Sequence, residues 1–121
     1  MGRSVLLQLA RDSIHEVYEA RRTIERETLL QKHPLLGENI AITVNIYDKD
    51  EELRGSAHIE DATLLDNIVL GAKKAVFEDT NFSPIVTSEY LECVVELILH
   101  TPEGVMSERD TPLLKEKKAL I

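Results

Sequence analysis

The chain is 121 residues long, enough for one domain, and its 22 acidic and 14 basic residues give it a net charge of −8. An acidic chain without a basic stripe repels phosphate backbones, so we expect no binding to nucleic acid. No apolar run approaches the roughly 20 residues that span a bilayer, and the first residues lack a secretory signal, so we expect no membrane association and a cytoplasmic location.

The first predicted element is a helix from about residue 4 to residue 30, with Ser4 as its N-cap. Apolar or small side chains recur at three- and four-residue spacing, as on one face of a helix; they are Leu6, Leu9, Ala10, Ser13, Ile14, Val17 and Ile24. The segment is longer than most globular helices, so we expect a break or fraying near Arg21 to Glu27. His33 precedes a proline, which disfavours helical geometry at His33 and ends any helix there.

Two strands are predicted next. In Ile40–Tyr47 branched apolar side chains alternate with Ala41, Thr43, Asn45 and Tyr47, which is typical of a half-buried strand. A polar connection of five residues, Asp48–Glu52, separates it from a shorter strand, Leu53–Ile59. We expect the two strands to pair as an antiparallel hairpin.

A second helix is predicted from Leu64 to about Glu78, with a wide apolar stripe along one side. Thr63, followed three residues later by Asp66, resembles a capping box. Residues 79–88 contain asparagine, serine and proline and are predicted to form a loop.

The third predicted strand is Leu91–His100, which has apolar side chains on both faces, so we expect it to lie centrally with both faces covered. Residues 101–104 break the strand, and the tail 105–121 has no clear pattern, although Leu113, Leu114 and the last three residues could dock on the core. The order of elements predicts one α+β domain over residues 1–121, an antiparallel sheet with helices packed on one face.

Several segments resemble, in matching order, the AMME chromosomal-region protein family, called AmmeMemoRadiSam system protein A in bacteria and archaea. They are LLQLARDSI at 6–14, the hairpin 42–59 with LRG at 53–55, AVFED at 75–79, NFSPI at 81–85 and LHTPE at 99–103. The family signature reads Leu-Arg-Gly-Cys-Ile-Gly, whereas this chain has Ser56, Ala57 and His58 after the first three residues. The resemblance implies that this domain lacks the family's C-terminal continuation, and that a Memo-like or radical-SAM protein is a candidate partner.

The retained part of the signature supplies the candidate site. The resemblance gives Arg54, Gly55, Ser56 and His58 as ligand-binding candidates, and Asp79 and Phe82, in the loop after the second helix, as structural candidates. An arginine beside a glycine on a strand can grip an anion that approaches the backbone. The alternative is an arginine paired with a carboxylate of the fold, beside a glycine at a bulge. Glu60, Asp61 and Asp79 are the candidate carboxylates, and we favour this second interpretation.

Other chemistry has weaker support from the sequence. Ser56 lacks the Gly-x-Ser-x-Gly elbow of a serine nucleophile, so the catalytic residues stay unassigned. His58, Glu60 and Asp61, with His100 from another strand, could ligate a metal, but no known ligand spacing is present and we expect no metal or cofactor. The one cysteine, Cys93, allows no internal disulfide and is predicted to be a core residue, as is Phe82.

Three functions therefore remain open. The first is a non-enzymatic binding or accessory domain that works near Arg54. The second is a small enzyme that uses Arg54 and His58 on an anionic small molecule, and the third is a degenerate family member with a structural role. We also expect a homodimer, because surface that the family's continuation would cover is left bare.

Overall fold

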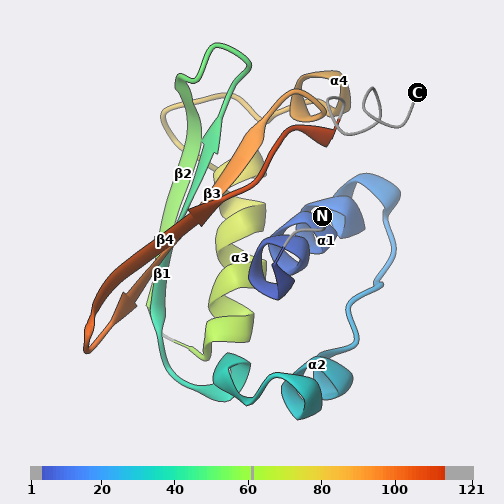
Figure 1. Ribbon diagram of the computed structural model, residues 1–121. Helices are drawn as coiled ribbons and strands as arrows, with labels where there is room; N and C mark the ends of the chain where they lie inside the picture. Colours follow the sequence, from blue (N-terminus) through green and yellow to red (C-terminus); the bar gives the residue numbers. More distant parts are fainter. Residues whose placement is uncertain (1–3, 61, 114–121) are drawn as a thin grey trace.

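Four antiparallel strands form a sheet that carries helices on one of its faces (Figure 1). The computed structural model describes residues 4–60 and 62–113. In chain order the elements are α1 (Val5–Glu19), α2 (Arg26–Lys32), the 3-10 helix η1 (Pro34–Gly37), β1 (Ala41–Tyr47), β2 (Leu53–Ile59), α3 (Leu64–Phe77), α4 (Thr87–Tyr90), β3 (Val94–Thr101) and β4 (Gly104–Arg109). The strand order across the sheet is β2-β1-β3-β4, so the predicted α+β class is confirmed.

The predicted first helix is two helices separated by a turn, as the expected break implied. The Ser4 side chain accepts a hydrogen bond from the backbone N–H of Leu7, as an N-cap does, and α1 ends at a left-handed residue, Ala20, with φ of 53°. The Glu16 carboxylate accepts the backbone N–H groups of Thr23 and Ile24 at 2.7 and 3.0 Å, which fixes the turn into α2. None of the described helices is long and apolar enough to cross a bilayer.

The core lies between the sheet and the two long helices, α1 and α3. One face of the strands supplies it, because alternate residues of a strand point to the same side. Its strand members, with exposed fractions of 7% or less, are Ile42, Val44, Ile46, Val95, Leu97 and Leu99. Cys93 is also fully buried, as predicted.

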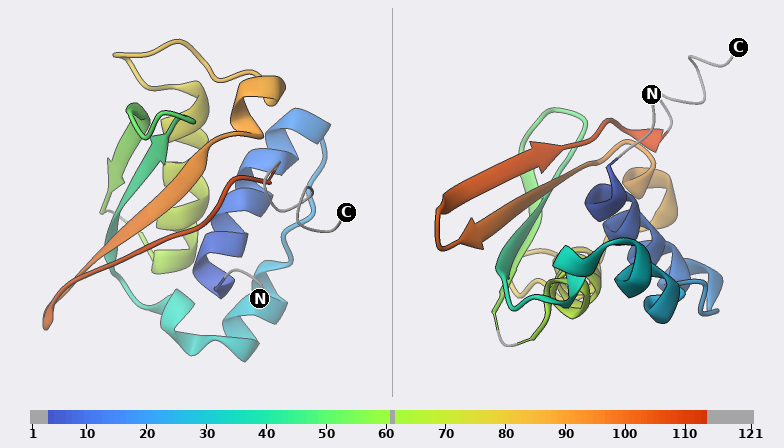
Figure 2. Two further views of the ribbon diagram at one scale, coloured as in Figure 1. Left: turned by 45° about the horizontal axis from the view of Figure 1, so that its top comes forward. Right: turned by 60° about the horizontal axis from the view of Figure 1, so that its bottom comes forward.

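None of the described helices lies over the opposite face of the sheet, as the right-hand view of Figure 2 shows. We call it the open face. β3 lies centrally, as predicted, but the expected cover on both sides is wrong, because Val94 and Ile98 on the open face are only half-buried. β3 is central because β1 and β4 pair with its two edges, not because helices sandwich it.

Three elements were absent from the sequence prediction: β4, α4 and η1, which begins at the proline expected to end the helix. β4 lies in the tail that had no clear pattern, and it forms a hairpin with β3 that extends past the helices (Figure 1). α4 lies at the end of the predicted loop and directly before the predicted third strand, which begins at Val94 and not at Leu91. Leu113 packs against the core as expected, whereas Leu114 and residues 119–121 lie outside the described residues.

Candidate functional site

Arg54 is held by an acidic partner within the fold. The register between β1 and β2 shifts at Ile46 and Tyr47, which leaves Arg54 as an extra residue in β2, a β-bulge. Its Nε and Nη2 donate to the two carboxylate oxygens of Glu89 at 2.7 and 3.2 Å, and its Nη1 donates to the carbonyl of Ser83 at 2.8 Å. The partner is thus Glu89, and neither Glu60 nor Asp79, while Asp61 lies outside the described residues.

Gly55 brings β2 close to α3. A Cβ atom at this position would lie 2.1 Å from the carbonyl oxygen of Ala75, so no larger residue fits without displacing the strand. The open space that a glycine leaves is therefore filled by the helix backbone. Gly55 serves the packing of the fold here and leaves no room for a ligand on that side.

Asp79 accepts a backbone hydrogen bond at the outer edge of β2. Its Oδ2 accepts the backbone N–H of Ser56 at 2.8 Å, and its Oδ1 accepts the backbone N–H of Asn81 at 2.7 Å. Asp79 thus ties the loop after α3 to the edge strand. Phe82 in this loop is 37% exposed, and the Arg54 guanidinium carbon lies 5.9 Å from the centroid of the Phe82 ring. The expectation that Phe82 fills the core is therefore wrong.

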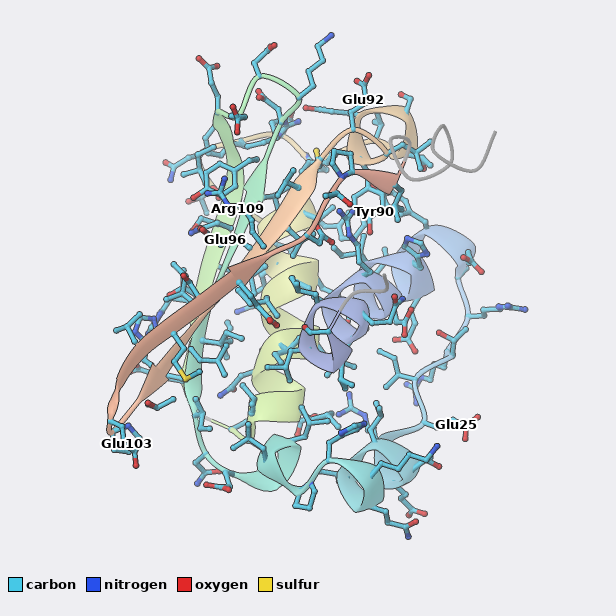
Figure 3. The ribbon with its side chains drawn as sticks, viewed as in Figure 1. Glu25, Tyr90, Glu92, Glu96, Glu103 and Arg109 are labelled. Carbon is cyan, nitrogen blue, oxygen red and sulfur yellow. The ribbon has the colours of Figure 1, made fainter. Side chains whose placement is uncertain are left out.

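A row of hydrogen-bonded polar side chains crosses all four strands on the open face. Ser56 donates its hydroxyl to the amide oxygen of Asn45 at 2.7 Å, and Asn45 donates its NH₂ group to Glu96 at 3.0 Å. Glu96 also accepts from Tyr47 at 2.8 Å and from Arg109 at 3.1 Å. We call these five residues the polar row; its Glu96 and Arg109 are side by side in Figure 3.

The polar row controls the charge of Glu96. Partial burial alone would raise the pKa of this carboxyl, but the hydrogen bonds from Asn45, Tyr47 and Arg109 outweigh burial and lower the pKa below its usual value. Glu96 is therefore ionised throughout the neutral range. It is the acceptor that joins the two central strands to the β4 edge.

A second cluster on the open face brings together two histidines. The hydroxyl oxygen of Thr43 lies 2.8 Å from His58 Nδ1 and 2.9 Å from His100 Nε2. His58 Nε2 lies 3.0 Å from a carboxylate oxygen of Glu60. We call these four residues the histidine cluster.

The candidate residues from the sequence thus separate into two groups. Arg54, Gly55 and Asp79 hold β2 against α3 and the loop that follows it, whereas Ser56 and His58 point to the open face. No hydrogen bond or ion pair joins Arg54 to His58 among the described residues. Thr43, Asn45 and Glu96 were missed, although strand alternation already placed Thr43 and Asn45 on the polar side of β1.

The comparisons with known proteins agree with the resemblance seen in the sequence. A sequence model of the AMMECR1 family matches residues 7–118, nearly the whole chain. The chain belongs to the AMMECR1 family. No curated protein matches it.

A solved structure resembles this AMMECR1 member in fold and sequence. It is described as the uncharacterised protein PH0010 from Pyrococcus horikoshii, with 25% identity and a TM-score of 0.69. The match covers 80% of this chain and 50% of that one, so this chain spans about half the length of the solved relative.

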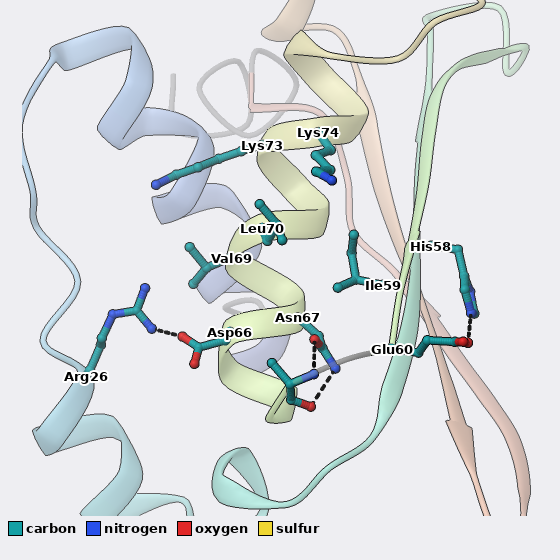
Figure 4. Close-up of a pocket in the computed structure, with 11 residues that line it drawn as sticks. Arg26, His58, Ile59, Glu60, Asp66, Asn67, Val69, Leu70, Lys73 and Lys74 are labelled. Carbon is teal, nitrogen blue, oxygen red and sulfur yellow. Dashed lines mark hydrogen bonds and ion pairs between the residues drawn. The ribbon is translucent and has the colours of Figure 1, made fainter.

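The AMMECR1 fold leaves a cavity beside β2, shown in Figure 4. It has a volume of about 650 Å³ and lies between β2 and α3, where Ile59, Leu70 and Lys74 line it. A second cavity of about 400 Å³ continues along the edge of β2 toward Asp79. His58 lines both cavities, and Arg54 lines neither.

Proposed function

We propose that this AMMECR1 member is a non-enzymatic binding domain that docks a protein partner on the open face of its sheet. The observation that carries the proposal is the polar row, which joins all four strands on a face that none of the helices in residues 4–60 and 62–113 covers. Side chains fixed by each other on neighbouring strands lose little conformational freedom when a partner binds. A face of this kind supports recognition without any catalytic group.

The arrangement of Arg54 supports this choice over an enzyme. An enzyme acting on an anionic small molecule would need Arg54 free to grip the anion near His58. The guanidinium instead has four hydrogen bonds to Glu89 and Ser83. With these donors engaged inside the fold, the retained signature favours a structural role for Arg54.

Of the side chains that the structure describes, those of the histidine cluster most favour catalysis. The cluster's hydrogen bonds run in the order found in a nucleophilic triad. Glu60 would orient the ring, His58 would act as the base, and the Thr43 hydroxyl would be the nucleophile. However, Thr43 is in β1, whose backbone pairs with β2 on one side and β3 on the other, so no backbone N–H beside it is free to stabilise an oxyanion. The binding function is therefore better supported.

The partners we propose are a Memo-like protein or a radical-SAM protein, by the association that the family resemblance implies, together with a second copy of the chain. A cytoplasmic location fits such partners and a buried free thiol at Cys93. A degenerate member with a purely structural role stays the remaining alternative, because Arg54, Gly55 and Asp79 all serve the fold.

A binding assay with purified proteins tests this function. The chain would be immobilised, and a Memo-like protein and a radical-SAM protein from the same organism would be passed over it. Ser107, exposed on β4 opposite Ile98 of the open face, and Ser88, exposed on α4 away from that face, allow matched variants. We expect one partner to bind the wild type and Ser88→Glu alike and Ser107→Glu more weakly. Equal binding to both variants, or no binding by either protein, would contradict the proposal.

A further inference from the structure

Two histidines far apart in the sequence converge on one atom of the open face. His58 on β2 and His100 on β3 flank Thr43 on β1, and one nitrogen of each ring lies within 2.9 Å of the Thr43 hydroxyl oxygen. The rings meet edge to face, with centroids 5.1 Å apart. The polar row does not include either histidine, and the proposed partner binding does not need them.

Donor and acceptor counting gives the direction of each hydrogen bond in the histidine cluster. An ionised Glu60 only accepts, so His58 Nε2 carries the hydrogen between them. Neutral His58 then has a lone pair on Nδ1, to which the Thr43 hydroxyl donates. The Thr43 oxygen can therefore only accept from His100, so Nε2 carries the hydrogen of that ring.

This arrangement prepares His58 Nδ1 as a ligand atom. Histidines that ligate metals commonly donate their other ring nitrogen to a carboxylate, which fixes the ring and makes the ligating nitrogen more basic. Glu60 stands in that position. The His100 side chain has no other hydrogen-bond partner among the described residues, so its ring hydrogen can move to Nδ1 and leave Nε2 free to ligate.

We propose that His58 Nδ1 and His100 Nε2 bind one divalent transition-metal ion, of the Zn²⁺ or Cu²⁺ class, in place of the Thr43 hydroxyl. Imidazole nitrogen suits these ions, whereas Mg²⁺ and Ca²⁺ prefer oxygen. Metal–nitrogen bonds of about 2.0–2.1 Å require both rings to close on the ion. His58, whose side chain is 47% exposed, has the freedom to do so. The net charge of −8 favours cations at the surface.

The site is an open one. No group of three or more His, Cys, Asp or Glu side chains able to hold a metal occurs in the described part of the chain. Two imidazoles therefore supply the protein ligands, and water fills the other positions. The affinity follows the usual order for nitrogen ligands, with Cu²⁺ above both Zn²⁺ and Ni²⁺. An ion bound this way stays accessible to a further ligand.

Calorimetric titration of the untagged, chelator-treated chain tests the site at neutral pH. Copper, zinc, nickel and magnesium chlorides would each be titrated into wild type and into His58→Ala and His100→Ala. We expect one Cu²⁺ or Zn²⁺ per chain with micromolar affinity, at least a tenfold loss in either variant, and no binding of Mg²⁺. Circular dichroism of each variant would establish that it folds.

Three further variants separate this site from incidental binding. His15→Ala and His33→Ala remove histidines on α1 and before η1 and should leave the affinity unchanged. Glu60→Gln should lower the metal affinity by about tenfold. This is the smallest loss usual for removing a carboxylate that orients a ligating histidine. No binding to the wild type overturns the proposal. So does equal binding by the folded His58→Ala and His100→Ala variants, or an equal loss in His15→Ala or His33→Ala.

Discussion

Arg11 on α1 and Asp110, the residue after β4, form a buried ion pair that joins the first helix to the end of the sheet. Nε of Arg11 donates to Asp110 at 2.7 Å and Nη2 donates at 2.9 Å, and the side chains are 1% and 2% exposed. Burial alone would lower the pKa of Arg11, but the hydrogen bonds and charge of Asp110, together with Tyr90, outweigh burial and raise the pKa above its usual value. The Arg11 guanidinium also donates to the carbonyl of Cys93, and Asp110 accepts the backbone N–H of Val95.

We expect Asp110→Ala to lower the free energy of unfolding by about 3–5 kcal/mol, because it leaves the Arg11 charge buried without its carboxylate. Urea denaturation would measure the change. Arg26→Ala is the control, since the Arg26–Asp66 pair is half exposed and such pairs contribute about 0–1 kcal/mol. Equal losses in the two variants would show that Arg11 and Asp110 do not stabilise the fold in this way.

Arg54→Ala should lower the free energy of unfolding by about 1–2 kcal/mol, because it removes charged hydrogen bonds to Glu89. The Glu89 side chain is 36% exposed, so solvent already screens part of this interaction. Thermal melts with and without a panel of anionic metabolites would test this. Arg22→Ala is the control, as Arg22 is exposed on the turn after α1. An unchanged melt in Arg54→Ala, with an anion that stabilises only the wild type, would show that Arg54 grips a ligand.

Gly55→Ala should destabilise the fold by about 1–3 kcal/mol, because its methyl group would overlap the carbonyl oxygen of Ala75 and push β2 away from α3. Gly37→Ala is the matched control, since the nearest atom to its Cβ would be Leu30 Cδ2 at 3.6 Å, an ordinary contact. Its effect should stay within about 0.5 kcal/mol. Chemical denaturation of both variants measures the difference, and a Gly55→Ala protein as stable as Gly37→Ala would be inconsistent with close strand–helix packing.

The Cys93 thiol should react slowly with a thiol reagent in the native protein, because burial, with a contribution from Glu89, raises its pKa to about 11. Labelling should become fast in denaturant. Ser56→Cys restores the cysteine of the family signature at a half-exposed position of the open face, and this variant should label faster than the wild type. Rapid labelling of the folded wild-type protein would contradict the burial of Cys93.

The same shift predicts how stability depends on pH. The folded pKa of Cys93 lies above that of the unfolded thiol, about 9, so the stabilisation is complete below pH 9 and is lost as the pH rises toward about 11. Cys93→Ala should remove this part of the alkaline loss. Unfolding curves of both proteins between these pH values would measure it, and parallel pH profiles would contradict the assignment.

Much of the fold could be predicted from apolar periodicity, and the elements that were missed lack it. β1 alternates because one face packs on helices, and α3 has a wide stripe because β1, β2 and α1 all contact it. β4 is exposed on nearly every residue, so no alternation could reveal it. α4 has only four residues, fewer than periodicity can detect.

The candidate site was harder to predict because its contacts join residues that are distant in the sequence. Arg54 pairs with Glu89, 35 residues away, and His58 meets His100 only because β1 lies between their strands. Local spacing carries no information about either contact. The arginine beside a glycine on a strand did indicate a bulge and an arginine–carboxylate pair, but the carboxylates expected for it, Glu60, Asp61 and Asp79, did not include Glu89.

We expect self-association through β4, because this strand forms an exposed edge of the sheet. Within the part of the chain that the structure describes, β4 pairs with β3 on one side only, and Val105 and Met106 are 66% and 64% exposed. An edge strand with a free row of backbone groups and apolar side chains tends to pair with another strand, and a second copy offers the same edge about a two-fold axis. We therefore expect a homodimer at micromolar concentration.

Sedimentation equilibrium would test the dimer with matched variants. Val105→Lys places a charge on the edge and should shift the population to single chains, because lysine opposes pairing between edge strands. Val17→Lys makes the same change at a 43% exposed position on α1 and should leave the dimer intact. A wild-type mass of one chain would contradict self-association. A dimer that survives Val105→Lys but not Val17→Lys would place the interface on the helical side of the molecule instead of at β4.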